Sequence, residues 1–239
     1  MHRLLRLAPA LTFVLLAAAL PVLRGQTLPS AATVLENVRR EFDRVKDYSA
    51  DLQAVVDMPG VKVPPMAAKI WFKQPDRVHF EAKGFAMLPR DAMSMNPRMF
   101  SEDLYDAVVQ GEETVDGARC LKVKLLAKSD TLRLQRAMLF VDPTRWLIVR
   151  MNTDPNQGGS AEITITYSFL ENKYFLPSKV VLRMQAMGGI RIGPKAKNPG
   201  KDDTAEKKKP ATIVMTYTNY RVNKGVSDEI FTRGKEDRP

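Results

Sequence analysis

The feature that most restricts the fold of this chain is an alternation of apolar and polar residues with a period of two. Between Tyr48 and Met58 the even positions are all apolar, whereas most odd positions are polar. Successive side chains of a strand point to opposite faces of a sheet, so this pattern predicts a half-buried strand. The same alternation returns at 66–73 and 77–83, with a Gln-Pro-Asp turn at 74–76 between them. Three successive strands with one apolar side predict a β-meander.

Further stretches along the chain show strand patterns, and turn-forming Pro, Asn and Gly residues separate several of them. About nine strands joined mostly by short turns favour one large, curved antiparallel sheet over βαβ units, so the predicted fold class is mainly β (α+β). The approximate bounds of these later strands are 118–126, 134–141, 147–152, 161–169, 178–185 and 211–220.

One helical pattern precedes the strands. Between Ser30 and Lys46 apolar residues recur at helical spacing, and Thr33 with Glu36 fits a capping box. Charged residues occupy the other side, so the helix should cover an apolar surface with a single stripe. A helix of this length spans only about 24 Å, which is too short to cap so wide a sheet. The apolar face must therefore adjoin either a second layer or a cavity.

Two segments interrupt the strand pattern. The first, 84–100, concentrates Met87, Met93 and Met95 with other apolar residues among prolines. Unbranched, polarizable Met side chains suit an adaptable apolar surface, so this segment is expected to be either a Met-rich lid over the sheet or a plug in the core. The second, 188–210, is rich in Lys, Gly and Pro and predicts a mobile basic loop between strands. Its charge is either solvated or docks on an acidic partner.

The N-terminal stretch has the composition of a secretory signal peptide. Arg3 and Arg6 precede an uncharged apolar run at 7–23. The run is shorter than the roughly 20 residues of a membrane span and contains prolines, so export with cleavage is favoured over a retained anchor. Cleavage after Ala19 and cleavage after Gly25 both fit the sequence. We expect a signal peptide at 1–25, a single domain at 26–239 and a location in the periplasm.

Residues that could support catalysis or bind metal are scarce. The chain has one cysteine, Cys120, and two histidines, His2 and His79, so it forms no intramolecular disulfide and has too few ligands for the usual zinc sites. His79 falls on the polar side of a strand, and Cys120 begins an apolar one, where burial is expected. Because Cys120 is also far from either cleavage position, the mature protein is not expected to be a lipoprotein. We expect no catalytic residue, no metal and no cofactor.

The formal net charge of the chain is +10. A charge of this sign is compatible with weak attraction to anionic lipid or to an acidic protein surface, but it locates no site. Export argues against nucleic acid as the partner.

Short motifs spread along the chain share their order with a known family. Residues 69–80 read Lys-Ile-Trp-Phe-Lys-Gln-Pro-Asp-Arg-Val-His-Phe, and 139–143, 146–150, 174–177 and 217–223 follow with similar spacing. This order resembles the LolA-like outer-membrane lipoprotein-sorting proteins and their RseB-like relatives, over nearly the whole mature chain. The resemblance implies a half-open β-barrel, closed by helices, with an apolar cavity that holds acyl chains.

The resemblance also carries over to single positions. Val78 and Phe80 match apolar positions that line the cavity of the family. The lipoprotein carriers place an arginine directly before the proline that is Pro75 here, and they use it to hand over the cargo. This chain has Gln74 at that position, and the Met-rich segment replaces the Asp-Gly-aromatic stretch that follows in those carriers.

The alternation and the resemblance together predict an apolar ligand cavity. An acyl chain of a dozen carbons could gain up to ~10 kcal/mol there, at ~0.8 kcal/mol for each buried CH₂. The residues predicted to line the cavity are Leu52, Val56, Ile70, Phe72, Val78, Phe80, Leu147, Val149, Ile163, Ile165, Val180 and Leu182 on the sheet, with Met87, Met93 and Met95 on the lid.

The predicted function is therefore binding rather than reaction. We expect a periplasmic carrier that holds the acyl chains of a lipoprotein or lipid, with a membrane-bound donor or acceptor protein as a further partner. An RseB-like envelope-stress sensor, which would release a bound protein when ligand arrives, is the alternative. A ligand-free barrel that acts as a scaffold is a third reading.

Overall fold

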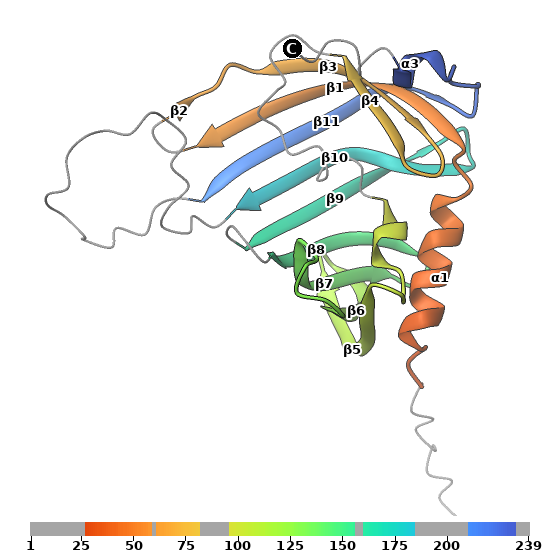
Figure 1. Ribbon diagram of the computed structural model, residues 1–239, viewed down its shortest axis with the longest axis vertical. Coiled ribbons are helices and arrows are strands. Elements are labelled where there is room, and N and C mark those ends of the chain that lie inside the picture. The colour runs from red at the N-terminus through yellow and green to blue at the C-terminus, as the bar shows by residue number, and fades with distance from the viewer. Residues whose placement is uncertain (1–26, 59–60, 82–95, 156–159, 185–209, 233–239) are drawn as a thin grey trace, which may run out of the picture.

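The strands of the chain dominate its architecture (Figure 1). The computed structural model describes residues 27–58, 61–81, 96–155, 160–184 and 210–232. The helices are α1 (Ala31–Phe42), the short 3-10 helix η2 (Pro97–Phe100) and α3 (Glu229–Thr232). The strands are β1 (Asp47–Met58), β2 (Val61–Lys62), β3 (Met66–Lys73), β4 (Arg77–Glu81), β5 (Tyr105–Val115), β6 (Ala118–Ala127), β7 (Leu134–Asp142), β8 (Leu147–Pro155), β9 (Ala161–Leu170), β10 (Tyr174–Met184) and β11 (Ala211–Val222).

All of these strands belong to one antiparallel sheet. Its order is β4-β3-β1-β11-β10-β9-β8-β7-β6-β5, and β2 pairs with β1 beside this path. Among the described strands β4 and β5 do not pair with each other, so the sheet curves without closing into a barrel. The predicted large, curved antiparallel sheet, a half-open barrel with a helix at its N-terminal end, is confirmed.

Two strands were not anticipated from the sequence. β2 is a short addition to β1, and β5 forms an edge of the sheet. In β5 the pairing with β6 shifts register between Val109 and Gly111, where Gly111 adopts φ 130°. A bulge of this kind interrupts the period of two, and Gly111 followed by Glu112 and Glu113 lacks the apolar signal of a buried strand.

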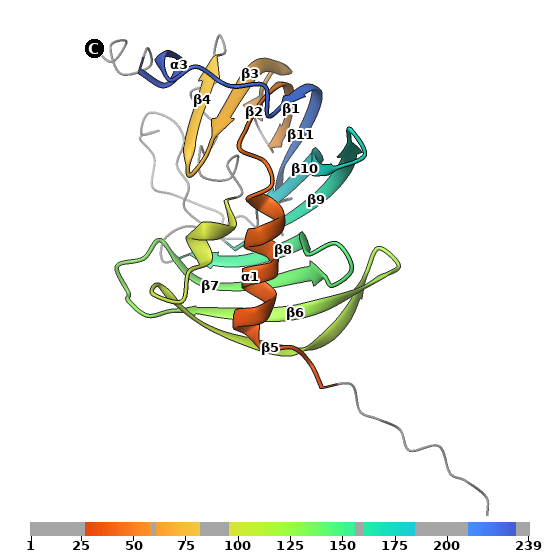
Figure 2. The same ribbon diagram turned by 90° about the vertical axis from the view of Figure 1, so that its right-hand side faces the viewer.

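The apolar core lies on one face of the sheet, here called the inner face. Its main cluster includes fully buried residues of β6 and β7 such as Val123, Leu125 and Leu139, together with Val34 and Val38 of α1. Because a single helix stripe supplies the facing side chains, α1 packs on the inner face and stands across β5–β8 (Figure 2). On the opposite face, Val115, Cys120 and Phe140 form a small cluster, here called the outer cluster.

The helix α1 is confirmed, with different ends from those predicted. It begins after Ser30, whose extended backbone and side-chain oxygen cap the helix by accepting a hydrogen bond from the backbone N–H of Thr33 at 3.1 Å. The predicted capping box on Thr33 and Glu36 is therefore one turn too late, because Ser30 already satisfies a free N–H of the first turn. The helix ends at Phe42, and the chain enters β1 at Asp47.

The corner between α1 and β1 is held by the chain that leaves β11. The Asn223 side chain accepts hydrogen bonds from the backbone N–H groups of Lys46 at 2.6 Å and Asp47 at 3.2 Å, and it donates to the carbonyl of Arg44 at 3.1 Å. The Asp47 carboxylate in turn accepts from the backbone N–H of Gly225 at 3.0 Å. Because these contacts join residues far apart in the sequence, they fix where the helix leaves the sheet.

Three predicted segments lie outside the described residues. They are the signal peptide at 1–25, most of the Met-rich segment and the basic loop, since the described chain omits 1–26, 82–95 and 185–209.

The corner gives a prediction for stability. Asn223→Ala should lower the free energy of unfolding by about 1–3 kcal/mol more than Asn219→Ala, because it removes three backbone contacts at a partly buried corner. Asn219 is the matched control: it also lies near the end of β11 with a positive φ, 55° against 52°, but its side chain makes one exposed hydrogen bond to Asp51. Urea denaturation followed by circular dichroism measures both changes, and equal losses would contradict the assignment.

Candidate ligand-binding site

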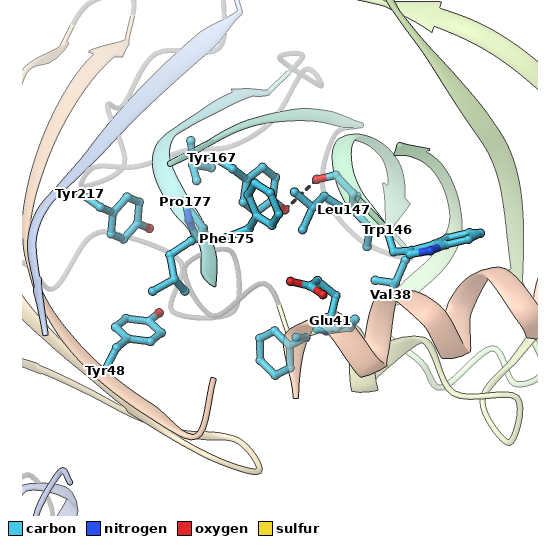
Figure 3. Close-up of a pocket in the computed structure, with 14 residues that line it drawn as sticks. Val38, Glu41, Tyr48, Trp146, Leu147, Tyr167, Phe175, Pro177 and Tyr217 are labelled. Carbon is cyan, nitrogen blue, oxygen red and sulfur yellow. Dashed lines mark hydrogen bonds between the residues drawn. The ribbon is translucent and has the colours of Figure 1, made fainter. Parts of the chain in front are cut away.

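A cavity lies between the C-terminal turn of α1 and the inner face of the sheet (Figure 3). Its volume is about 70 Å³, which is room for a group of a few heavy atoms, since a water molecule occupies about 30 Å³ in the liquid. The lining comes from α1, η2, the β7–β8 turn and strands β1 and β8–β11. The lining residues are Val38, Glu41, Phe42, Tyr48, Pro97, Trp146, Leu147, Ile148, Tyr167, Phe175, Leu176, Pro177, Val180 and Tyr217.

Buried tyrosines make up much of the wall. Tyr48 stacks on Phe72 with ring centroids 5.2 Å apart, and it meets Tyr220 edge-on at 5.5 Å. The Tyr167 hydroxyl donates to the carbonyl of Ile148 at 2.9 Å. These contacts fix the rings, while the hydroxyls of Tyr48 and of Tyr217, from β1 and β11, point toward the interior (Figure 3).

Burial also changes the ionisation of this group. It raises the pKa of Tyr48, Tyr167 and Tyr217 well above the ordinary value of about 10. Tyr220, whose hydroxyl donates to the carbonyl of Pro177 at 2.6 Å, has its pKa raised by burial as well. The tyrosines are therefore neutral hydrogen-bonding groups at physiological pH.

Among the described residues, Glu41 is the only charged one that lines the cavity. It lies in the last turn of α1, and its carboxylate points toward the inner face of the sheet (Figure 3). The side chain is 17% exposed, and its two oxygens accept hydrogen bonds from the same nitrogen of Arg44 at 2.8 and 2.9 Å. Arg44 is itself 42% exposed, so the ion pair lies between the cavity and the solvent.

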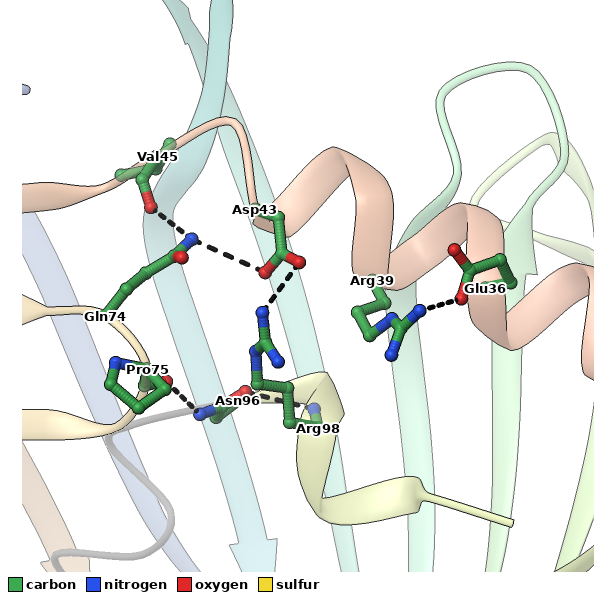
Figure 4. Close-up of polar contacts among 8 residues, drawn as sticks. All are labelled: Glu36, Arg39, Asp43, Val45, Gln74, Pro75, Asn96 and Arg98. Atoms are coloured by element: carbon green, nitrogen blue, oxygen red, sulfur yellow. Dashed lines mark hydrogen bonds and ion pairs between the residues drawn. The ribbon is translucent and has the colours of Figure 1, made fainter.

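The end of the cavity that Pro97 lines is held by polar contacts between η2, α1 and the β3–β4 turn (Figure 4). The Arg98 guanidinium donates to the Asp43 carboxylate at 2.7 Å, and the Asn96 side chain donates to the carbonyl of Pro75 at 2.8 Å. Asn96 also caps η2 by accepting from the backbone N–H of Arg98 at 3.0 Å. These contacts place Pro97 against the cavity.

Gln74, which the motif resemblance sets against an arginine of the lipoprotein carriers, belongs to the same network. Its side-chain amide donates to the carbonyl of Val45 at 2.8 Å and lies 3.4 Å from the Asp43 carboxylate (Figure 4). An amide is neutral, so Gln74 leaves the charge of Asp43 to Arg98. On the exposed side of α1, Glu36 pairs with Arg39.

Most of the predicted cavity residues lie on the inner face, but few of them reach this cavity. Leu147 and Val180 line it. Val56, Val78 and Phe80 are half-buried and pack against the core. Fully or almost fully buried members of the main cluster are Leu52, Ile70, Phe72, Ile163, Ile165 and Leu182. Met87, Met93 and Met95 lie outside the described residues.

The prediction that Val149 faces inward is wrong. The pairing between β7 and β8 steps from Phe140 with Arg150 to Val141 with Ile148, and it leaves Val149 without a partner. This bulge shifts the alternation by one residue, so Val149 packs with the outer cluster and Ile148 faces the main core.

Sequence reasoning missed the aromatic wall and the helix side of the cavity. Tyr167, Phe175 and Tyr217 come from strands that were recognised, but apolar alternation does not distinguish a cavity-lining ring from a core ring. Glu41 was assigned to no face. Its position next to Phe42 and one turn after Val38, which both line the cavity, was an available signal for an inward carboxylate.

The side chains that carry ordinary catalytic chemistry lie elsewhere. Cys120 is fully buried in the outer cluster, as its strand pattern predicted, and His79 is half-buried on β4, with its ring centroid 5.6 Å from that of Trp71. Over the described part of the chain, no group of three or more His, Cys, Asp and Glu side chains is placed to hold a metal ion. Within the same residues, none of the helices has the length and apolar character to cross a membrane.

Solved structures share this architecture. A DUF1329 family protein from Desulfovibrio piger is 15% identical, with a TM-score of 0.58, over 87% of this chain and 99% of its own. A domain described as an outer membrane lipoprotein-sorting protein from Vibrio parahaemolyticus is 8% identical, with a TM-score of 0.60, over 87% of this chain and 100% of its own. A LolA superfamily protein from Nitrosomonas europaea is 10% identical, with a TM-score of 0.55, over 87% and 100%.

The fold is LolA-like. Sequence identities this low show that the fold is shared and nothing more. The shared fold agrees with the resemblance of the sequence motifs. No protein-family model matches the sequence, and no curated protein matches it. What the LolA-like fold contributes here is an open sheet whose inner face and α1 enclose an aromatic cavity.

The buried tyrosines predict a loss of stability at alkaline pH. The unfolded chain gives up its tyrosine protons near pH 10, below the raised pKa values of Tyr48, Tyr167 and Tyr217 in the folded state. Their contribution is therefore complete below about pH 10 and decreases as the pH rises further. Urea denaturation at several values from about pH 8 to about pH 11 should show this decrease.

A matched pair of variants isolates the effect. Tyr48→Phe should make the alkaline loss shallower. Tyr174→Phe should not, because hydrogen bonds with Asn223 and Lys173 lower the pKa of Tyr174. Phenolate absorbance reports ionisation directly, and a folded protein in which every tyrosine ionises near pH 10 would refute the prediction.

Proposed function

We propose that this protein is a periplasmic carrier that binds an acyl chain of a lipid or lipoprotein between the inner face of the sheet and α1. The observation that carries the proposal is the apolar, aromatic cavity under α1, on the inner face of an open LolA-like sheet. Concave sites with a mostly apolar lining and a few converging polar groups are typical of ligand pockets. The composition of the N-terminal stretch, which predicts export, supports a site that works beside membranes.

The size of the cavity bears on how a chain would enter. Ligand pockets usually measure about 300–1,000 Å³, whereas this one measures about 70 Å³. A long acyl chain therefore requires α1 and η2 to move away from the sheet. The ion pair of Arg98 with Asp43 links η2 to the end of α1 and is partly exposed. Exposed ion pairs stabilise a folded protein by only about 0–1 kcal/mol. Burial of an acyl chain, at ~0.8 kcal/mol for each CH₂, outweighs the loss of that ion pair after a few carbons.

Proteins of the donor and acceptor membranes are the partners that a carrier needs. The domain from Vibrio parahaemolyticus is described as an outer membrane lipoprotein-sorting protein, and its shared fold supports this role for the present chain. The RseB-like alternative, a sensor that holds a regulatory protein, uses the same cavity. It stays a prediction, and the experiment below separates the two by what co-purifies.

The test is native mass spectrometry of the protein purified from its own envelope, followed by organic extraction and lipid analysis. We expect a stoichiometric acyl-bearing ligand. Val56→Asp should reduce the bound fraction severalfold. Val56 is half-buried on the inner face outside the small cavity, where the rest of a long chain would lie, and a carboxylate there opposes an apolar chain.

Val55→Asp is the matched control. Val55 is the adjacent residue of the same strand, 49% exposed, and its side chain points to the other face. The Val55→Asp variant should retain the ligand, and circular dichroism should show that both variants fold. A protein that is free of ligand, and that stays free after incubation with lipids and lipopeptides, would refute the carrier. A stable protein partner without lipid would favour the sensor.

A further inference from the structure

The cavity under α1 combines two features that a plain acyl site does not need. One is the inward carboxylate of Glu41, which is 17% exposed. The other is a wall with many aromatic rings (Figure 3). Burying a carboxylate against apolar rings costs free energy unless a partner compensates it, and the partner of Glu41 is Arg44. The aromatic lining residues are Phe42, Tyr48, Trp146, Tyr167, Phe175 and Tyr217.

The two features attract the same kind of ligand. The face of an aromatic ring is electrostatically negative and attracts cations within about 6 Å of its centroid. A carboxylate provides a full negative charge beside the rings. The chain already pairs cations with rings near this site, since the Arg145 guanidinium lies 5.9 Å from the Phe175 centroid. A compact cation would therefore be favoured by both the rings and Glu41.

The ion pair with Arg44 does not occupy all the hydrogen-bond acceptor sites of the Glu41 carboxylate. A single nitrogen of Arg44 contacts both Glu41 oxygens, and an ionised carboxylate has about four lone-pair sites. The other charged groups nearby are already paired: Arg145 donates to Asp142 at 2.6 Å, and Arg98 donates to Asp43 at 2.7 Å. Glu41 can thus accept a further donor from the cavity side.

We propose that this cavity binds an ammonium head group, so that the preferred ligand is an amphiphile with a positively charged nitrogen. The head group would lie beside Glu41 among the rings, and the alkyl chain would run along the inner face. A volume of about 70 Å³ suits a head group of a few heavy atoms. The Tyr48 and Tyr217 hydroxyls are neutral and can accept hydrogen bonds from an ammonium N–H.

This preference opposes the overall charge of the protein. A formal net charge of +10 repels cations and attracts anions at long range. Selection of a cationic amphiphile would therefore reflect the local site rather than bulk electrostatics. The inference rests on the proposed function, because it requires that an alkyl chain binds at all.

Two probes that differ mainly in charge provide the test. Dodecyldimethylammonium, the protonated form of dodecyldimethylamine near neutral pH, carries a cationic head with one N–H, and dodecyldimethylamine oxide has a similar shape without net charge near neutral pH. Both are titrated below their micelle concentrations into the purified protein by calorimetry. We expect the ammonium probe to bind about tenfold more tightly, a margin in the range that cation–π contacts provide.

A matched pair of variants tests whether Glu41 causes the preference for the ammonium probe. Glu41→Gln should abolish it, so that the two probes bind this variant with equal affinity. Glu36→Gln should keep it, because Glu36 lies on the same helix and pairs with Arg39 as Glu41 pairs with Arg44, but on the exposed side. A preference that survives Glu41→Gln would overturn the proposal.

The outcomes separate this inference from the proposed function. Equal affinity for the two probes overturns the ammonium site and leaves the proposed acyl-binding function unaffected. Failure of both probes to bind overturns both. Fluorescence gives a second readout that does not depend on Glu41: in Trp71→Phe, Trp146 is the only remaining tryptophan, and its emission should change on binding of the ammonium probe. An unchanged emission would place the head group elsewhere and refute the site.

Discussion

The position of α1 against an open sheet depends on a small hydrogen-bonded corner. Asn223, at the end of β11, satisfies backbone groups of Arg44, Lys46 and Asp47 where the helix turns into β1. The sheet has two unpaired edges among its described strands, so closure of a barrel does not position the helix. Without this corner, the packing of Val34 and Val38 and the contacts of Asp43 with Gln74 and Arg98 would have to set the distance between the helix and the inner face.

That distance sets what the inner face can do. The last turn of α1 holds Glu41 and Phe42 over the tyrosine wall and leaves a space of about 70 Å³. Stacking on Phe72 holds the Tyr48 ring, and a hydrogen bond to Ile148 holds the Tyr167 ring, so these two rings resist collapse into the space. The surrounding polar network involves Gln74 and Arg98, which lie at the edge of the site.

The sequence predicted the fold far better than the site. Alternation identified most strands because half-buried strands must alternate, and the helix was found by its stripe. It failed where the backbone departs from regular geometry. The Gly111 bulge hid β5, and the bulge at Val149 reversed the face of that residue. The site was harder, because a ring that lines a cavity and a ring that fills a core produce the same pattern.

What the sequence determined by itself is most of the strands, the amphipathic helix and the scarcity of catalytic side chains, since each follows from local periodicity or composition. Only the tertiary structure decided that Glu41 faces an aromatic cavity, that Gln74 and Arg98 share Asp43, and that Asn223 holds the corner of the helix. The physical reason is distance along the chain. These contacts join segments far apart in sequence, and no local pattern specifies which of many side chains meet when a sheet curves.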